Sequence, residues 1–349
     1  MLLVGLLATS CGTSETSSSP IVVTTTDIWA DVVEKATCGQ VEVENIIPSG
    51  SDPHNYSPSV RDIIALENAE LVVENGLGLE ELLSDTLASA SNKLVVADLI
   101  NSEDDLHEED DLHGEDDHDD DHEDDLHGED DHDDDLHGED DHDEDDHHPE
   151  GTALPAEGHD HEDDHEDDLH DHSGDDPHIW FDFNIVRSLV SNLETHLAEV
   201  ATNTDELEDC ADDYIAQLHE TEDIVAATLA SVPEDRRLLV TQHDTLQRLA
   251  ESHGYEIIGS VIPSTSTLAE ADLRHLIELE EQVNSTGAAA IFVDASGVNS
   301  DIETFANRIG LPLVVLYTES LGAPDTGADT YTGMMLTNAD RIADALASS

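Results

Sequence analysis

The sequence predicts an α/β protein with two lobes, each built on a mainly parallel sheet, on either side of one long helical segment. Two observations predict this fold. Short apolar segments alternate with helical patterns in two separate runs, which is typical of parallel sheets covered by helices. Between the runs, residues 186–230 contain hardly a turn signal and repeat apolar residues at helical spacing.

The first run begins with the β-branched stretch IVVTTT at residues 21–26, which predicts a buried strand. The pattern DIWADVVEKATC follows and predicts a helix that ends before Gly39. The same alternation continues to residue 98. Further strands are expected at 41–48, 71–76 and 94–98, and further helices at about 57–69 and 79–90. These elements form the first predicted lobe.

The second run follows Pro233, where the long helical segment ends. Strands are expected at 237–244, 255–263, 288–295 and 311–317, with helices between them, one of them over 268–283, and a final helix after Thr332. The chain therefore divides into a leader and tether at 1–20, a first lobe at 21–183 that includes an insertion at 103–176, a helical segment with the linking helix at 184–233, and a second lobe at 234–349.

The insertion holds 41 acidic residues and 15 of the chain's 22 histidines, but no Lys or Arg. The unit HGEDDHD recurs in it at 113–119, 127–133 and 137–143. Such a tract cannot bury enough apolar area to offset chain entropy, so we expect it to be disordered. A solubilising spacer would explain the acidic residues but not the regular histidines, which we expect to collect metal ions weakly: His107, His113, His118, His122, His127, His132, His137, His142, His147, His148, His159, His161, His165, His170 and His172.

The whole chain is strongly acidic, with 86 Asp and Glu against 10 Lys and Arg. Outside the insertion, 45 acidic residues remain against the same 10 basic ones. A surface of this kind is self-repelling at low ionic strength, and a salt-rich habitat would explain it. Nucleic acid is excluded as a partner, because phosphate binding needs a basic patch and the sequence has none.

Residues 1–20, MLLVGLLATSCGTSETSSSP, combine a short apolar run with a cysteine and a Ser/Thr-rich stretch. This order indicates a lipoprotein signal, in which Cys11 becomes the acylated residue that anchors the protein to the membrane, extracytoplasmically, at the cell surface or in the periplasm. The alternative is an ordinary signal peptide with an incidental cysteine. Cys38 and Cys210 remain, and they either pair, as export permits, or are two buried thiols.

Three histidines outside the insertion stand at the ends of predicted strands. His54 follows VEVENIIP, His178 precedes an aromatic pair in DPHIWF, and His243 closes RLLVTQHD. Glu319 follows the last predicted strand in LPLVVLYTES. Ligands of α/β sheets bind beyond the carboxyl ends of the strands, so these side chains are expected to converge. Three imidazoles and a carboxylate suit a first-row divalent ion, above all Zn²⁺. Each residue alone is more often a hydrogen-bonded loop residue.

The segments around these residues resemble the zinc- and manganese-binding lipoproteins that serve bacterial ABC importers. The resemblance covers nearly all of residues 21–349, and it is carried by GSDPHNYSPSVRD, DPHIWFD, VTQHD, IPSTSTLAEADLRHLIE, IFVDAS, LYTESLG and YTGMMLTNADRIADAL. It implies two α/β lobes joined by one long rigid helix, with the metal in the cleft between the lobes. It also implies that His54 and His178 are ligands from the first lobe, and His243 and Glu319 from the second. A His-rich insertion before DPHIW is typical of the zinc-specific branch.

The resemblance implies a solute-binding protein, not an enzyme, that captures Zn²⁺ and delivers it to an ABC-type membrane permease. We expect it to be a monomer. Binding of Mn²⁺ or Fe²⁺ is the alternative within the family, although His243 rather than a carboxylate at that position favours zinc. A zinc-dependent hydrolase is a second alternative, but no HExxH pair lies outside the insertion to supply ligands and a general base. A metal-storage or adhesion protein is a third.

The sequence departs from the usual residues of that family at several positions, and the departure at Glu319 touches the expected site directly. The family commonly has Asp at the position of Glu319 and Glu at the position of Asp294. Because Glu reaches one methylene further than Asp, the fourth ligand is expected to bind differently or to yield to water. Asp244, beside His243, is expected to fix an imidazole tautomer, the alternative being an exposed acid at a helix start. We expect the ligands held by the lobes, and not the insertion, to form the tight site, because they are pre-positioned.

Overall fold

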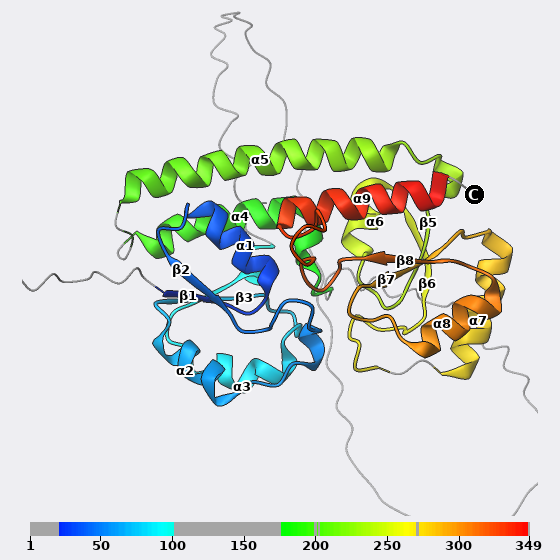
Figure 1. Ribbon diagram of the computed structural model, residues 1–349, viewed down its shortest axis with the longest axis horizontal. Coiled ribbons are helices and arrows are strands. Elements are labelled where there is room, and N and C mark those ends of the chain that lie inside the picture. Colours follow the sequence, from blue (N-terminus) through cyan, green and yellow to red (C-terminus); the bar gives the residue numbers. More distant parts are fainter. Residues whose placement is uncertain (1–20, 101–175, 199–200, 202, 270–271, 348–349) are drawn as a thin grey trace, which may run out of the picture. The chain divides into compact units, whose positions relative to one another are not determined.

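The computed structural model describes residues 21–100, 176–198, 201, 203–269 and 272–347. The predicted leader with Cys11 and the 15 histidines of the insertion lie outside the described residues. The described residues form two four-stranded sheets in which every pair of neighbouring strands is parallel (Figure 1). None of the helices in the described part of the chain has the length and apolar character that a membrane span requires.

The first sheet has the strand order β2-β1-β3-β4. Its strands are β1 (Ile21–Thr24), β2 (Glu42–Asn45), β3 (Leu71–Glu74) and β4 (Lys93–Val95), and its helices are α1 (Asp27–Ala36), α2 (Val60–Asn68) and α3 (Ser84–Leu87). Short 3₁₀ helices lie at Pro53–Asn55 (η1), Glu81–Leu83 (η2) and Val96–Leu99 (η3). β1 and β3 are short apolar stretches within the predicted ranges. β2 also lies in its predicted range but has the sequence EVEN, and most of the strand predicted at 94–98 is η3.

The helix predicted over 79–90 is shorter than expected. It is split into η2 and the four-residue α3. The cause is Glu80, whose carboxylate turns back and accepts the backbone N–H groups of Asn75 and Gly76 at 2.8 and 3.3 Å. A side chain that bonds preceding backbone favours a turn over the first turn of a helix.

Two helices connect the lobes. α4 (Phe183–Leu197) packs on the first lobe, and α5 (Thr204–Ala230) has 27 residues, which corresponds to about 40 Å. α5 contacts α1 and α4 in the first lobe and α6 and α9 in the second, so it extends along both (Figure 1). The long apolar-periodic segment in the sequence is this pair of helices.

The second sheet has the order β6-β5-β7-β8. Its strands are β5 (Leu238–Thr241), β6 (Glu256–Ser260), β7 (Ile291–Asp294) and β8 (Leu313–Leu316), and its helices are α6 (Gln247–His253), α7 (Leu273–Thr286), α8 (Ser300–Ile309) and α9 (Tyr331–Ala347). A 3₁₀ turn, η5 (Glu234–Arg236), precedes β5. The predicted start of one helix at 268 is wrong, since α7 begins after Asp272, whose carboxylate caps the N–H groups of Arg274 and His275.

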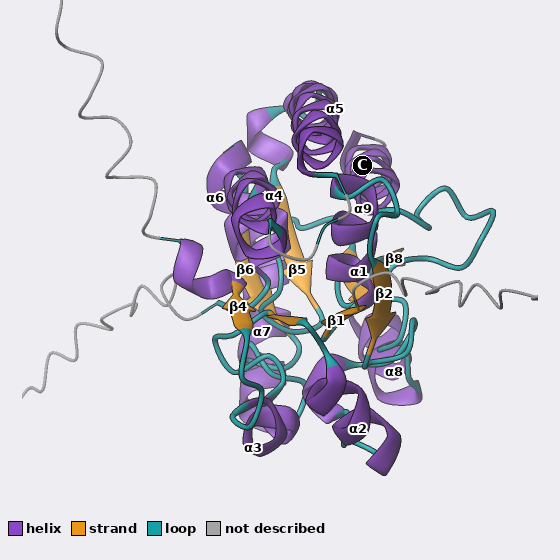
Figure 2. Cartoon of the chain, turned by 90° about the vertical axis from the view of Figure 1, so that its left-hand side faces the viewer, coloured by secondary structure: helices purple, strands orange, loops and turns teal. Residues whose placement is uncertain are grey.

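One apolar core joins the lobes behind the strand ends. Trp29 of α1 packs edge-on against Trp180, with ring centroids 6.2 Å apart, and Tyr331 of α9 packs on Phe183. All four side chains are buried. Figure 2 shows α4, α5 and α9 on one side of the strands and α2, α3 and α8 on the other. The lobes are therefore packed together through a shared core on the side of α4, α5 and α9.

Cys38 and Cys210 form a disulfide, which decides between the two alternatives left by the sequence. Their Cα atoms are 5.9 Å apart, within the usual range for such a bond. The bond connects the turn after α1 to the first half of α5. It therefore fixes the long helix to the first lobe.

Candidate metal centre

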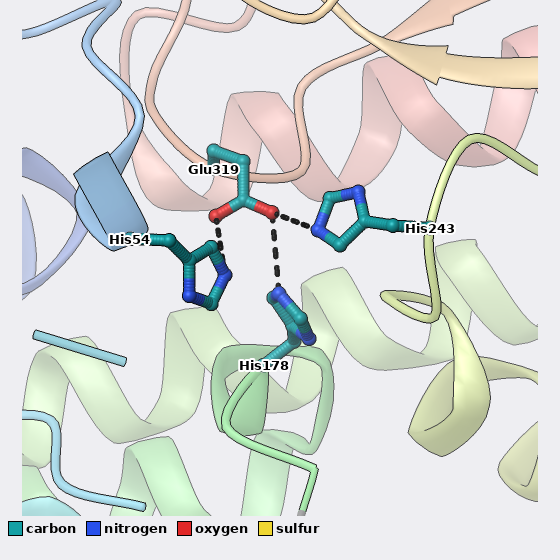
Figure 3. A group of neighbouring side chains, drawn as sticks. All are labelled: His54, His178, His243 and Glu319. Carbon is teal, nitrogen blue, oxygen red and sulfur yellow. Dashed lines mark ion pairs between the residues drawn. The ribbon is translucent and has the colours of Figure 1, made fainter. Parts of the chain in front are cut away.

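His54 lies in η1, in the loop between β2 and α2. Asp52 caps this turn, because its carboxylate accepts the His54 backbone N–H at 2.9 Å, and Pro53 occupies the first helical position, where a missing N–H costs nothing. The residue is 2% exposed. The motif DPHN thus builds a rigid turn that directs the imidazole inward (Figure 3).

His178 lies directly before η4 (Ile179–Phe181), at the entry to α4. One oxygen of Asp176 is 3.0 Å from the His178 backbone nitrogen and 2.6 Å from its Nδ1. Asn75, at the end of β3, donates its amide to the Pro177 carbonyl at 2.9 Å. The imidazole is fully buried, and these contacts orient its Nε2 toward the other candidate ligands.

His243 and Glu319 come from the second lobe. His243 follows β5, and the next residue, Asp244, donates its backbone N–H to the Ser264 carbonyl at 2.9 Å. Glu319 follows β8, and its backbone N–H donates to the Asp294 carboxylate at 3.1 Å. The same Asp294 oxygen accepts the Thr318 N–H and hydroxyl. Both candidate ligands are at most 2% exposed.

The structure brings these four residues together (Figure 3). One ligand atom from each lies within 4.8 Å of the others. The Glu319 carboxylate is 2.9 Å from His243 Nε2, 3.2 Å from His178 Nε2 and 3.9 Å from His54 Nε2. They form the one group of this composition found among the described residues. His54, His243 and Glu319 follow strands, as expected, whereas His178 directly precedes η4 and is not at the end of any described strand, so that part of the expectation is wrong.

Several of the converging atoms lack a hydrogen-bond partner of suitable geometry within the described part of the chain. They are the Nε2 atoms of all three histidines and both oxygens of Glu319. Buried polar atoms are nearly always hydrogen-bonded, and clustered exceptions need an explanation. Nitrogen and oxygen atoms that converge in a buried space without such partners suit a cation that binds all of them.

The buried charges shift the ionisation of the cluster. Burial lowers the pKa of His54 to about 4, and the Glu319 carboxylate offsets only part of this effect. Burial also opposes the charge on His178, yet the carboxylates of Glu319 and Asp176 raise its pKa to about 10. Burial would raise the pKa of Glu319, but His178 and His243 hold it well below its usual range. In the absence of an ion, His178 and Glu319 therefore form a buried ion pair.

The structure corrects two expectations about the surroundings of the site. Asp244 does not hold an imidazole, because neither ring nitrogen of His243 has a hydrogen-bond partner within the described residues. Asp176, counted in the disordered insertion, is instead a buried residue, 1% exposed, that contacts His178. The acidic run in front of it hides this role in the sequence. Asp294 was also missed as a support of Glu319, although its place at the end of β7 was the available signal.

A cavity of about 230 Å³ borders the cluster. His243 and Glu319 form part of its wall, as do Asp52 and Thr267, whose hydroxyl donates to Asp52 at 2.6 Å. The remaining wall is mostly polar, with Gln242 among its residues. The cavity can admit a small hydrophilic species to the buried cluster.

Residues 22–345 match the family model of ZnuA, the periplasmic component A of the zinc-uptake complex. The chain belongs to this family. ZnuA-family proteins are metal-binding solute-binding components of ABC importers and not enzymes, so this chain is a metal-binding component of such a transporter and the hydrolase alternative is set aside.

Curated relatives of this ZnuA-family chain carry names of different metals. It is 24% identical to the manganese-binding lipoprotein MntA of Halalkalibacterium halodurans over 99% of this chain and 96% of the relative. It is 25% identical to the zinc-binding protein TroA of Treponema pallidum over 94% of this chain and 89% of the relative. The fold is that of the solved periplasmic zinc-binding protein TroA, with a TM-score of 0.70, 23% identity, and coverage of 94% of this chain and 99% of TroA.

Proposed function

We propose that this protein captures Zn²⁺ outside the cytoplasm and delivers it to an ABC-type metal permease, with His54, His178, His243 and Glu319 as the ligands of the ion. The observation that carries the proposal is the convergence of four buried side chains from two lobes, whose ligand atoms lie within 4.8 Å of one another. Their hydrogen-bonding capacity is unsatisfied at the point where they meet.

The distances between these atoms fit a small ion. In a tetrahedral zinc shell with bonds near 2.1 Å, neighbouring ligand atoms are about 3.4 Å apart. The three contacts of Glu319 with the histidines, at 2.9, 3.2 and 3.9 Å, lie on either side of that value. Three neutral nitrogens and one carboxylate give a nitrogen-rich shell, which suits Zn²⁺ better than Mn²⁺.

Manganese is the second candidate, and one observation favours it. Both oxygens of Glu319 face the histidines, since Oε1 is nearest to His178 and His243 and Oε2 is nearest to His54. A carboxylate that binds through both oxygens gives five donor atoms, which is closer to the higher coordination number and oxygen content that Mn²⁺ prefers.

Competition between the two metals tests the proposal. Zn²⁺ and Mn²⁺ are offered at equal free concentrations to the full chain and to a chain that lacks residues 103–172, with His54→Ala as the variant of the site. We expect one tightly bound Zn²⁺ in both chains, and loss of that ion in the variant. Tight binding that disappears with residues 103–172 would place the site in the insertion. Displacement of Zn²⁺ by Mn²⁺ would make the protein a manganese receptor.

We also propose roles for the parts of the chain outside the described residues. Acylation of Cys11 would anchor the receptor beside its permease, and the histidines of the insertion would raise the local ion concentration through weak binding. Deletion of residues 103–172 should then slow uptake when zinc is scarce while leaving the affinity of the tight site unchanged.

A further inference from the structure

The segment that follows Glu319 is attached to the other lobe. Residues 317–330 connect β8 to α9, both in the second lobe, yet this connection and the first residue of α9 contact α1 and the loop before η1. The Leu321 N–H donates to both oxygens of Asp27, at 3.3 Å each. The Gly50 N–H donates to the Ser320 hydroxyl at 3.1 Å. The loop that carries a second-lobe ligand is thus bonded to the first lobe within two residues of that ligand.

A second attachment lies at the far end of the same segment. The Tyr331 N–H, at the start of α9, donates to Asp31 at 2.8 Å. A carboxylate at this position satisfies a free N–H of the first turn and interacts favourably with the helix dipole. The Tyr331 hydroxyl donates to the Trp180 carbonyl, two residues beyond His178, at 2.9 Å. Both ends of the segment are therefore held by the first lobe.

The acids that make these bonds are costly to bury. Asp27 and Asp31 are four residues apart, on one face of α1, and they are 6% and 9% exposed. Burial raises the pKa of both, and their hydrogen bonds to Leu321 and Tyr331 counteract it. An apolar side chain would fill this space at lower cost. Asp27 and Asp31 instead accept the backbone N–H groups of Leu321 and Tyr331, and so bond the first lobe to the second.

Glu319 is more constrained than His243. Its backbone N–H is held by Asp294 in its own lobe, and the two residues after it are held by Gly50 and Asp27 of the first lobe. By contrast, the backbone on either side of His243 is bonded within its own lobe, since the Gln242 and Asp244 N–H groups donate to the carbonyls of Phe292 and Ser264 at 2.9 Å. Glu319 is in this way fixed to the lobe that carries His54 and His178.

We infer that Asp27 is a positioning residue for the ion ligand Glu319, which it holds against the first lobe through the Leu321 N–H. The inference rests on the proposed function, because it takes Glu319 as a ligand. Under this inference Glu319 stays in place with His54 and His178 of the first lobe, and His243 is the ligand that moves with the second lobe. An opening of the lobes would then withdraw His243 from the ion first.

A double-mutant cycle in the full chain tests this role. Zn²⁺ affinity is measured by competition with a chelator for Asp27→Ala, Glu319→Ala and the double variant, and the absorption spectrum of one equivalent of Co²⁺ reports the ligand set. Residues that support a metal ligand typically contribute about tenfold to a hundredfold in affinity, so Asp27→Ala should weaken binding by that factor. It should also shift the Co²⁺ spectrum toward that of Glu319→Ala. In the Glu319→Ala background the Asp27 substitution should have no further effect, because the two residues act as one unit.

Two further sets of variants separate positioning from stability. Asp272→Ala removes an acidic cap from α7, away from the cluster, and should lower the melting temperature while leaving affinity and spectrum unchanged. Asp27→Asn keeps an acceptor for the Leu321 N–H and should lose less affinity than Asp27→Ala. If Asp27→Ala does not fold, Asp27→Asn and Ser320→Ala replace it in the cycle, since each weakens one attachment.

Two results would overturn the inference. If Asp27→Ala behaves like Asp272→Ala, or if the losses of Asp27→Ala and Glu319→Ala are additive, Asp27 supports only the fold. If Glu319→Ala itself keeps the affinity and spectrum of the parent, Glu319 is not a ligand and the proposed ligand set fails together with the inference. The second result differs from the first because it is visible in the single Glu319 variant.

Discussion

One carboxylate oxygen of Asp176 contacts both the backbone nitrogen and the Nδ1 of His178, at 3.0 and 2.6 Å. The contact fixes a proton on Nδ1, which leaves Nε2, 3.2 Å from Glu319, as the nitrogen that can bind an ion once its own proton has left. A carboxylate in this position orients the ring and makes the nitrogen that faces the ion more basic. Asp176 therefore determines which atom of His178 is available to an ion.

Replacing Asp176 by Ala should weaken Zn²⁺ binding by about tenfold to a hundredfold, since the imidazole loses its orientation and part of its basicity. Chelator competition measures the effect. Asp244→Ala is the matched control, because Asp244 is also an acid next to a candidate ligand but does not contact the His243 ring nitrogens. Equal losses in the two variants would show that the Asp176 contact has no specific role.

Zinc binding should release one proton from the protein near neutral pH. The Glu319 and Asp176 carboxylates outweigh burial and raise the pKa of His178 to about 10, while burial lowers the pKa of His54 to about 4. At neutral pH without metal, His178 is thus charged and His54 is neutral. An imidazole binds metal only when neutral, so the ion must displace the His178 proton, and affinity should rise about tenfold per pH unit below the pKa of His178.

Calorimetry in buffers of different ionisation enthalpy counts this proton. The raised pKa of His178 also makes the stability of the metal-free protein depend on pH. The pKa of His178 is raised on folding, so its contribution is fully present below about pH 6.5 and is lost as the pH rises toward 10. His178→Gln should abolish both the proton release on zinc binding and this pH-dependent contribution to stability. Metal binding without proton release at pH 7.5 would mean that His178 is neutral before the ion arrives.

Loss of the disulfide should lower the free energy of unfolding. Cys38 and Cys210 are separated by 172 residues, and removal of a native disulfide that closes a loop costs about 2–5 kcal/mol. Urea unfolding of the metal-free double variant Cys38→Ser/Cys210→Ser measures the loss. A reductant should destabilise the parent by the same amount and leave the double variant unchanged. A parent whose unfolding midpoint does not respond to reductant contradicts the pairing.

Salt should stabilise the metal-free protein. The chain carries a formal net charge of −76, and screening reduces the repulsion between its acidic groups. The melting temperature should therefore rise with NaCl concentration, most steeply at low ionic strength. Sucrose at equal osmolality is the control, because it favours burial without screening charge. Equal effects of NaCl and sucrose would argue against charge repulsion as the cause.

The sequence predicted the fold and the four converging residues for the same physical reason. Short apolar strands alternate with helices in both lobes, and parallel strands deliver the residues after them to one edge. His54, His243 and Glu319 could therefore be assigned to one place before their distances were known. His178 was assigned with them as a strand-end residue, but the structure places it directly before η4, between the insertion and α4.

The supports of the site were less predictable, because their roles depend on contacts between distant residues. Asp176 follows an acidic run of the same composition, so nothing local distinguishes it. Asp27 reads as an ordinary first-turn acid of α1, yet its carboxylate bonds Leu321, 294 positions away. Glu80 shortens a predicted helix through a side-chain contact that helix periodicity does not reveal. Such contacts are products of tertiary structure.

The identity of the ligand at position 243 should set the choice of metal. His243 supplies the third nitrogen of the cluster, 2.9 Å from Glu319, and it is the candidate ligand whose ring nitrogens lack other partners among the described residues. His243→Glu replaces nitrogen by hard oxygen, which zinc tolerates less well and manganese prefers. The ratio of Zn²⁺ to Mn²⁺ affinity should fall by at least about tenfold, the factor expected for a change of roughly 1.4 kcal/mol. Competition of the two metals at equal free concentrations measures this ratio.

His243→Gln, of equal size but uncharged, should weaken the binding of both metals without the same shift in their affinity ratio. An unchanged ratio in His243→Glu would mean that position 243 does not select the ion, and that selectivity lies in the reach of Glu319.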